Sequence, residues 1–247
     1  MDYKKINNEG IYIKDSFIST DVLNQALNNT HAMLKQLNGY PIDVFKILGM
    51  RNLSSFVGEL FASCLSKASN GLLKSNPHQD GYPDLLLMDQ KGIDLWNSLS
   101  DMLKDKAPFS PFENGGIEIK ATCGAVPSPK ILLKKNKFKP EIGDQRIELL
   151  TSYDWKAHHR DTNNLIGLLW DFVDNVPTIV ALFYSATLNQ EHWGKIIQPT
   201  EGGGRTTSVS IMAREGVKKM YEGTVLIVDD PRYVNFVNKY NKDSIIK

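Results

Sequence analysis

The chain has 247 residues, a hydrophobic content of 41% and a formal net charge of +1 at pH 7, which together predict one large α/β domain or two small ones with a sizeable core. No apolar run approaches the roughly 20 residues of a membrane span, and the polar start lacks the apolar stretch of a signal peptide. The two cysteines, Cys64 and Cys123, exclude a disulfide framework, so we expect a cytoplasmic protein with buried thiols.

The first third of the chain is predicted to be helical. Thr20 can cap a helix whose apolar residues continue to Leu37, and a Gly-Tyr-Pro sequence ends it. A second helix is expected to begin near residues 54–55, with apolar residues at helical spacing beyond that point. Glu59 lies roughly opposite the apolar stripe of this helix and is therefore not a core residue. The two helices make up an N-terminal helical portion over about residues 20–70.

Two short apolar segments, residues 82–87 and 116–121, read as buried strands at hairpin-like distance from each other. Side chains alternate between the two faces of a strand, so Glu118 and Lys120 project to one face and the intervening isoleucines to the other. Asp84 lies at the start of the first strand. These charged groups would be costly to bury without a purpose, and a divalent metal with a phosphate would supply one.

The tripeptide acid-any-Lys is a weak signal by itself, and it occurs four times in this chain. Only Glu118-Ile119-Lys120 is centred in an apolar strand and preceded by a Pro-Asp pair, Pro83-Asp84, at a strand start. The alternative interpretation is a surface strand that carries an ordinary Glu/Lys pair. We favour a catalytic function because only this tripeptide combines both features.

The remaining elements are predicted to complete a sheet. An insert after the first of these strands carries a helix around residues 95–103, and another short helix is expected around residues 215–221. Residues 174–177 have the composition of a hairpin turn. Further strands are expected at residues 147–153, 165–173, 178–184, 206–212 and 224–228.

Through Pro83-Asp84 and Glu118-Ile119-Lys120 the chain resembles the PD-(D/E)XK nuclease superfamily, and within it the type II restriction endonucleases. The resemblance implies an α/β (α+β) fold with a restriction-endonuclease-like core, in which helices flank a mixed central β-sheet. It also implies a sequence-specific endonuclease that hydrolyses phosphodiester bonds of double-stranded DNA with Mg²⁺. No repeat or linker is present, so we expect a single nuclease domain over residues 1–247, with its catalytic and recognition core over about residues 71–230.

The resemblance further implies roles for individual residues. Asp84, Glu118 and Lys120 would be the catalytic residues, with Lys120 beside the attacking water and the scissile phosphate. Magnesium prefers oxygen ligands, which Asp84, Glu118 and the backbone carbonyl of Ile119 would supply, and Mn²⁺ is expected to substitute for it. Relatives often contribute an acid from the preceding helix, which makes Glu59 a further candidate metal ligand. A solvated Glu59 is the alternative.

Three polar segments are candidates for contact with DNA. A lysine-rich stretch after the second catalytic strand could meet phosphates, although a solvated surface loop is equally compatible with it. In residues 202–210 three glycines let the backbone approach a ligand closely, and the alternative is a flexible hairpin loop. An arginine there can pair with guanine. The candidate DNA-binding residues are Lys130, Lys134, Lys135, His158, Arg205, Thr206, Thr207 and Ser208.

The resemblance also implies partners. Cutting both strands of a palindromic target would require a homodimer with one site per subunit. A cognate DNA methyltransferase is expected as a genetic rather than a physical partner, in the cytoplasm of a prokaryote and away from any membrane. The alternatives are a DNA repair or recombination nuclease, and a non-catalytic DNA-binding protein on the same scaffold. The intact set of Asp84, Glu118 and Lys120 disfavours the last, because a protein that only binds DNA has no need of all three.

Overall fold

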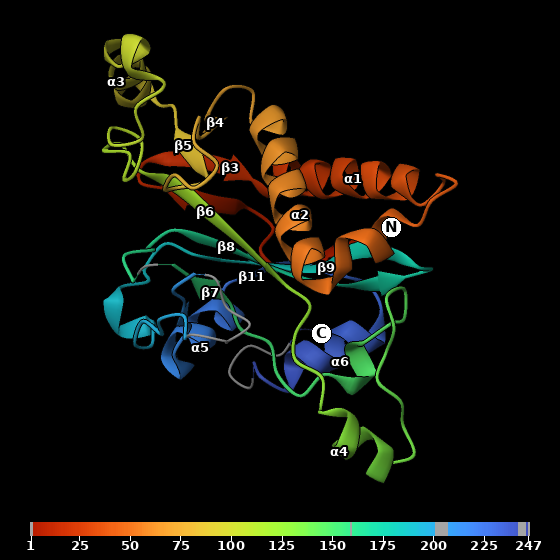
Figure 1. Cartoon of the computed structure of the whole chain (residues 1–247). Helices are drawn as coiled ribbons and strands as arrows, with labels where there is room; N and C mark the ends of the chain where they lie inside the picture. Colours follow the sequence, from red (N-terminus) through yellow and green to blue (C-terminus); the bar gives the residue numbers. More distant parts are fainter. Residues whose placement is uncertain (1, 159, 201–206, 242–245, 247) are drawn as a thin grey trace.

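A seven-stranded mixed sheet forms the centre of the computed structural model, which describes residues 2–158, 160–200, 207–241 and 246 (Figure 1). Its strands are β1 (Tyr3–Lys5), β4 (Leu73–Ser75), β5 (Leu85–Leu87), β6 (Gly116–Thr122), β8 (Leu165–Val173), β9 (Val176–Ser185) and β11 (Thr224–Val228). The order across the sheet is β1-β11-β9-β8-β6-β5-β4. All neighbours are antiparallel except the parallel pair of β6 and β8. The predicted α/β class with a mixed central sheet is confirmed.

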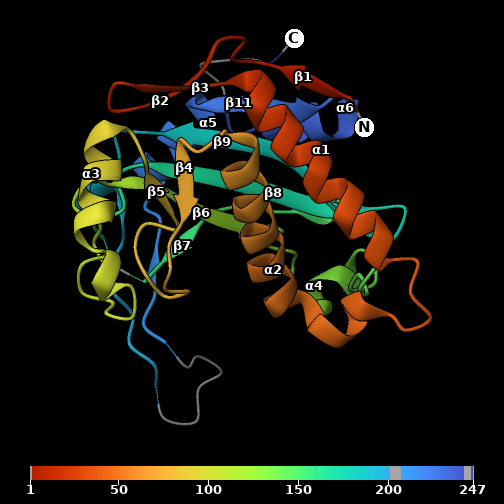
Figure 2. The same ribbon diagram turned by 90° about the horizontal axis from the view of Figure 1, so that it is seen from above.

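Helices cover both faces of this sheet. Two long helices, α1 (Thr20–Leu37) and α2 (Val44–Ala68), lie on one face. Two shorter helices, α5 (Arg214–Glu222) and α6 (Pro231–Asn238), lie on the other face (Figure 1, Figure 2). No helix in the described part of the chain is long and apolar enough to cross a membrane.

The sheet separates two buried apolar cores, and β8 contributes to both. Leu168 and Trp170 belong to the core that includes residues of α1 and α2. Leu165 and Leu169 belong to the core that includes residues of α5 and α6. This division follows from the alternation of side chains along a strand, and it explains why β8 is apolar along most of its length.

Smaller elements lie around the sheet. They are β2 (Gly10–Ile13), β3 (Ser16–Ser19), β7 (Lys156–Ala157), β10 (Ser210–Ile211), α3 (Gln90–Ser98), α4 (Pro129–Lys134) and the 3₁₀ helices η1 (Ser100–Met102), η2 (Ile147–Leu149) and η3 (Gln190–His192). The strands β2 and β3 form a hairpin, and β7 pairs with β10. The insert between β5 and β6 contains a helix as predicted, but this helix, α3, begins at Gln90 and ends at Ser98, and η1 follows it within the predicted range of 95–103.

The predicted helices form, but their starts differ from the expectation. The helix α1 ends at Leu37 as predicted, but it is capped by Ser19 and begins at Thr20, the residue predicted as its cap. The predicted start of α2 at residues 54–55 is wrong, because the side chain of Asp43 accepts a backbone N–H and starts the helix well before that point. Gly49, at φ +68°, kinks α2, and the predicted helix lies entirely beyond this kink.

The predicted strands are confirmed in the centre of the sheet, whereas two strands predicted elsewhere are wrong or shortened. The bounds of β8 and β11 are as predicted, and β8 and β9 form the expected hairpin. The strand predicted at residues 147–153 is wrong. Its first residues form η2, because the backbone N–H groups of Arg146 and Ile147 donate to the buried carboxylate of Asp171 at 2.7 and 3.1 Å. The described part of the strand predicted at 206–212 is strand only in β10.

The histidine of α1 makes a testable contribution to stability. The ring of His31 accepts the backbone N–H of Ile179 at 3.0 Å, and burial lowers its pKa to about 4. Between that value and the ordinary pKa of about 6.5, the unfolded chain binds a proton that the native state does not. We expect the free energy of unfolding to fall by about 3 kcal/mol from pH 7 to pH 4 through this group alone.

Urea unfolding of the wild type and of His31→Gln at several pH values measures this contribution. Glutamine can accept the same N–H without titrating, so the stability of the variant should depend less on pH by about that amount. If the free energy of unfolding depended on pH equally in the two proteins, His31 would not be the group that titrates.

Candidate active site

The pairing of β5 with β6 brings the two predicted acids together. The strands are antiparallel, with Leu85 opposite Ile117, so Asp84, which directly precedes β5, lies beside Glu118. The backbone N–H of Asp84 donates to Oε2 of Glu118 at 3.2 Å. In the other direction, the backbone N–H of Ile119 donates to Oδ2 of Asp84 at 2.7 Å. Each carboxylate is therefore held by the backbone of the opposite strand.

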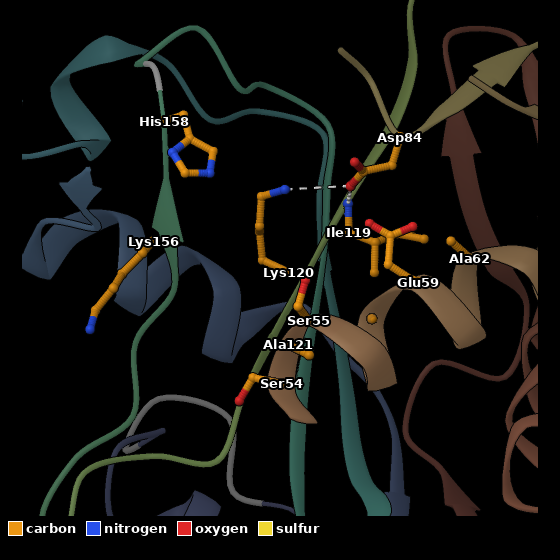
Figure 3. Close-up of a pocket in the computed structure, with 11 residues that line it drawn as sticks. Ser54, Ser55, Glu59, Ala62, Asp84, Ile119, Lys120, Ala121, Lys156 and His158 are labelled. Carbon is orange, nitrogen blue, oxygen red and sulfur yellow. Dashed lines mark hydrogen bonds and ion pairs between the residues drawn. The ribbon is translucent and has the colours of Figure 1, made fainter. Parts of the chain in front are cut away.

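Lys120 completes this arrangement from the same face of β6 as Glu118, as the alternation predicts. Its Nζ lies 2.5 Å from Oε1 of Glu118. The same atom lies 3.5 Å from Oδ2 of Asp84, as the dashed line in Figure 3 marks. Two carboxylates and one ammonium thus converge from adjacent strands, and the predicted proximity of Asp84, Glu118 and Lys120 is found.

Burial and charge set the protonation of this cluster. Only 5% of the surface of Glu118 is exposed, and burial raises its pKa to about 7, although the ammonium of Lys120 opposes that shift. Burial alone would lower the pKa of Lys120, but Glu118 and Asp84 outweigh it, and the pKa is raised above its ordinary value. Lys120 is therefore a cation at neutral pH. Because buried ion pairs add little to stability on balance, stability alone does not account for this cluster.

Glu59 reaches the same place from α2. The helix crosses β6 closely where Gly58 faces Ala121, and this approach places the next residue, Glu59, at the edge of the cluster. Burial raises the pKa of the Glu59 carboxyl, and the charge of Asp84 raises it further. In Figure 3 its carboxylate lies on the Asp84 side of the site. The acid predicted on the polar face of this helix therefore lines the site.

A pocket of about 160 Å³ opens over these residues. Asp84, Ile119 and Lys120 line it together with Glu59. Its other side is formed by residues of β7 and the position after it, Lys156 and His158, which lie across Lys120 from Asp84 (Figure 3).

His158 is thereby placed at the site, as a candidate contact for a ligand. Its Nδ1 lies 2.9 Å from the backbone carbonyl oxygen of Ser208. A carbonyl oxygen only accepts, so Nδ1 carries the proton and donates, and the assignment leaves Nε2 for other partners. Lys156 ends another of the four acid-any-Lys tripeptides and is not among the predicted site residues. Only the pairing of β7 with β10 fixes Lys156 beside the pocket.

The other predicted DNA-binding residues are distributed more widely. Thr207 lines a second pocket next to the first. Arg205 and Thr206 lie outside the described residues. Lys130 and Lys134 belong to α4 and Lys135 follows it, on a segment that projects from the body of the protein (Figure 1).

The donor set of the site suits a magnesium ion. Among the described residues no group of three or more His, Cys, Asp or Glu side chains is arranged to hold a metal. Magnesium, however, commonly takes only one or two protein carboxylates and completes its shell with water. Asp84 and Glu118 supply two carboxylates that already converge on a cationic group, the ammonium of Lys120. Asp84 and Ile119 line the open pocket and Glu118 lies beside Asp84, so these oxygen donors fit the ion in chemistry.

Comparisons with known proteins add no relative to this picture. No protein-family model, curated protein or solved structure matches the chain. The function is therefore inferred from the residues of the site. Its two carboxylates are held by the backbones of two paired strands, and the ammonium of Lys120 pairs with them.

Proposed function

We propose that this protein is a sequence-specific endonuclease that hydrolyses phosphodiester bonds of double-stranded DNA with Mg²⁺, in the manner of type II restriction enzymes. One observation carries the proposal. Asp84, Glu118 and Lys120 converge beside an open pocket, which Asp84 and Lys120 line and whose opposite side carries Lys156 and His158. Carboxylates that suit a metal and the ammonium of Lys120, which suits a phosphate, therefore lie side by side. The sheet that carries them supports a restriction-endonuclease-like core as part of the same proposal.

Each side chain has a distinct task in this reaction. Hydrolysis requires a positioned water, neutralised charge on the phosphoryl oxygens and stabilisation of the leaving oxygen. Lys120, held as a cation by Glu118 and Asp84, would orient the water or stabilise the charge that develops on the phosphate. Lys156 and His158 would contact phosphate oxygens from the opposite side. Magnesium held by Asp84, Glu118 and the carbonyl of Ile119, with Glu59 as a further acid, would supply Lewis-acid stabilisation of the phosphoryl charge.

The proposed partners follow from the reaction. Cutting both strands of a palindromic site would take a homodimer, with one cluster of Asp84, Glu118 and Lys120 in each subunit. A restriction enzyme also needs its host DNA protected, which implies a methyltransferase of the same target specificity. A repair or recombination nuclease would use the same cluster without a fixed target sequence.

Plasmid cleavage tests the function directly. The purified protein should cut plasmid DNA in the presence of Mg²⁺ or Mn²⁺ and not in the presence of EDTA, and sequencing of the fragment ends should show one recurrent target. Cleavage without a recurrent sequence would favour the repair or recombination nuclease. Sequence-specific binding without cleavage would favour the non-catalytic DNA-binding protein.

Metal binding should also be visible without DNA. At a Mg²⁺ or Mn²⁺ concentration about 100 times the dissociation constant, binding to the native state adds about 2.7 kcal/mol of stability. For a chain of this size we expect a rise in melting temperature of about 5–10 °C. The rise should disappear in Asp84→Asn and persist in Asp80→Asn, an exposed acid that pairs with Lys106 outside the pocket. An equal rise in melting temperature in both variants would show that the ion binds at another site.

A further inference from the structure

The pocket over Asp84 and Lys120 is the middle of a longer groove along α2. A neighbouring pocket of about 610 Å³ shares Ser55 and Glu59 with it. On the other side a pocket of about 420 Å³ shares Ser54 and Lys120. A ligand that occupies the site can therefore extend in both directions, towards residues 76–79 at one end and towards residues 122–124 at the other.

The two arms of this groove differ in chemistry. We call them the amide arm, which is the pocket lined by Asn52, Ser55, Phe56, Glu59, Asn76, Pro77 and Gln79, and the cationic arm, which is the pocket lined by Arg51, Lys120 and Lys156 among others. Among the described residues of the amide arm only Glu59 is charged. A carboxylate repels phosphate, so this arm suits a part of DNA other than its backbone. The cationic arm, with three cations and one acid, Asp154, suits phosphates.

The amides of the first arm are of two kinds. Asn76 is fully used within the protein: its side chain donates to the carbonyls of Pro83 and Phe109 at 3.0 and 2.8 Å and accepts the N–H of His78 at 3.0 Å. These bonds tie the loop at residues 76–79 to the residues just before β5. The hydrogen bonds of Asn76 therefore hold the loop that carries Gln79 in a fixed position relative to Asp84.

Asn52 and Gln79 form the other kind. Both are exposed, and within the described part of the chain neither side chain forms a hydrogen bond. They reach the arm from different elements, Asn52 from α2 and Gln79 from the loop before β5. A free carboxamide offers a donor and an acceptor together, which is the pattern that matches the N6 and N7 edge of adenine.

We propose that the amide arm reads base edges, and that Asn52 and Gln79 are specificity-determining residues that contact a base pair next to the scissile phosphate. This inference rests on the proposed function as a DNA-cleaving enzyme and adds the place of base recognition to it. The arm shares Glu59 with the catalytic pocket, so the base that is read lies within a few nucleotides of the bond that is cut.

Selection from a pool of random DNA duplexes tests the inference without cleavage. The pool is bound to Lys120→Ala, which should not cut, and to the same protein with Asn52→Ala or Gln79→Ala added, and the retained duplexes are sequenced. The parent should select a motif, and each added substitution should reduce the preference at one position about tenfold while leaving the other positions unchanged. Asn52→Asp and Gln79→Glu, which keep the size and lose the amide donor, should change the preferred base at the same position.

Lys156→Ala on the same background is the matched control from the cationic arm. It should weaken the binding of all duplexes alike and leave the selected motif unchanged. A motif that survives unaltered in the Asn52 and Gln79 variants would overturn the inference, as would a parent that selects no motif. A wild type that fails to cut plasmid, but whose motif changes with Asn52 or Gln79, would refute the nuclease and leave base recognition in place.

Discussion

Replacing Asp84 or Lys120 by alanine should abolish magnesium-dependent cleavage while leaving DNA binding largely intact. Oδ2 of Asp84 lies 3.5 Å from Nζ of Lys120, and the same ammonium lies 2.5 Å from Oε1 of Glu118. Removing one preorganised charge-stabilising group from an active site typically lowers the rate by a hundred- to a thousandfold, and loss of a metal ligand adds to this. We expect the cleavage rate of each variant to fall by about a thousandfold or more, which corresponds to about 4 kcal/mol in the activation barrier.

Single-turnover cleavage of a duplex that contains the target measures the cleavage rate. Binding of the same duplex, measured in parallel, gives the affinity for DNA. Because removal of one partner can leave the other charge buried and unpaired, Lys120→Met is a second variant that keeps the aliphatic length. The matched control is the pair of Asp80 and Lys106, which lies in the same part of the chain, 2.6 Å apart and outside the pocket. Alanine at either control position should leave cleavage unchanged. Cleavage near the wild-type rate in an Asp84 or Lys120 variant would refute the site.

The core of the site was predictable because it depends on local rules. Alternation along one strand places Glu118 and Lys120 on one face, and this needs no knowledge of the fold. The position of Asp84 required only that two nearby apolar segments pair as neighbours, which they do as β5 and β6. The long apolar strands β8 and β11 were predictable for a similar reason, since a strand buried on both faces reads as a continuous apolar run.

The rest of the site depends on contacts between distant segments. Lys156 and His158 reach the pocket because β7 pairs with β10, and such short strands leave almost no pattern in the sequence. Residues 147–153 are apolar enough to resemble a strand, yet the backbone N–H groups of Arg146 and Ile147, where this stretch begins, donate to the carboxylate of Asp171 in β8. The early start of α2 depends on a capping contact of Asp43 and on the kink at Gly49. Without those contacts Asn52 is predicted to lie before the helix rather than within it.

Gly116→Ala should damage both the fold and the site, although this residue carries no functional group. Gly116 pairs with Leu86 at the start of β6 and has φ +157°. A Cβ at this position would lie 1.9 Å from the carbonyl oxygen of Leu85 and 2.9 Å from the ring of Pro83. Since the first of these atoms belongs to the backbone of β5, relief of the clash requires the two strands to separate. We expect the free energy of unfolding to fall by about 3 kcal/mol.

The same separation of the strands should also lower the cleavage rate, because the backbones of β5 and β6 hold the carboxylates of Asp84 and Glu118 in place. Urea unfolding measures the first effect, and cleavage at a temperature where the variant stays folded measures the second. The control is Gly39→Ala, where an added Cβ would lie 3.4 Å from its nearest neighbour, in a loop after α1. A Gly116→Ala protein of wild-type stability and cleavage rate would mean that close approach of these strands is not what assembles the site. Normal stability with lost cleavage would instead show that a small shift of β5 is enough to separate the acids.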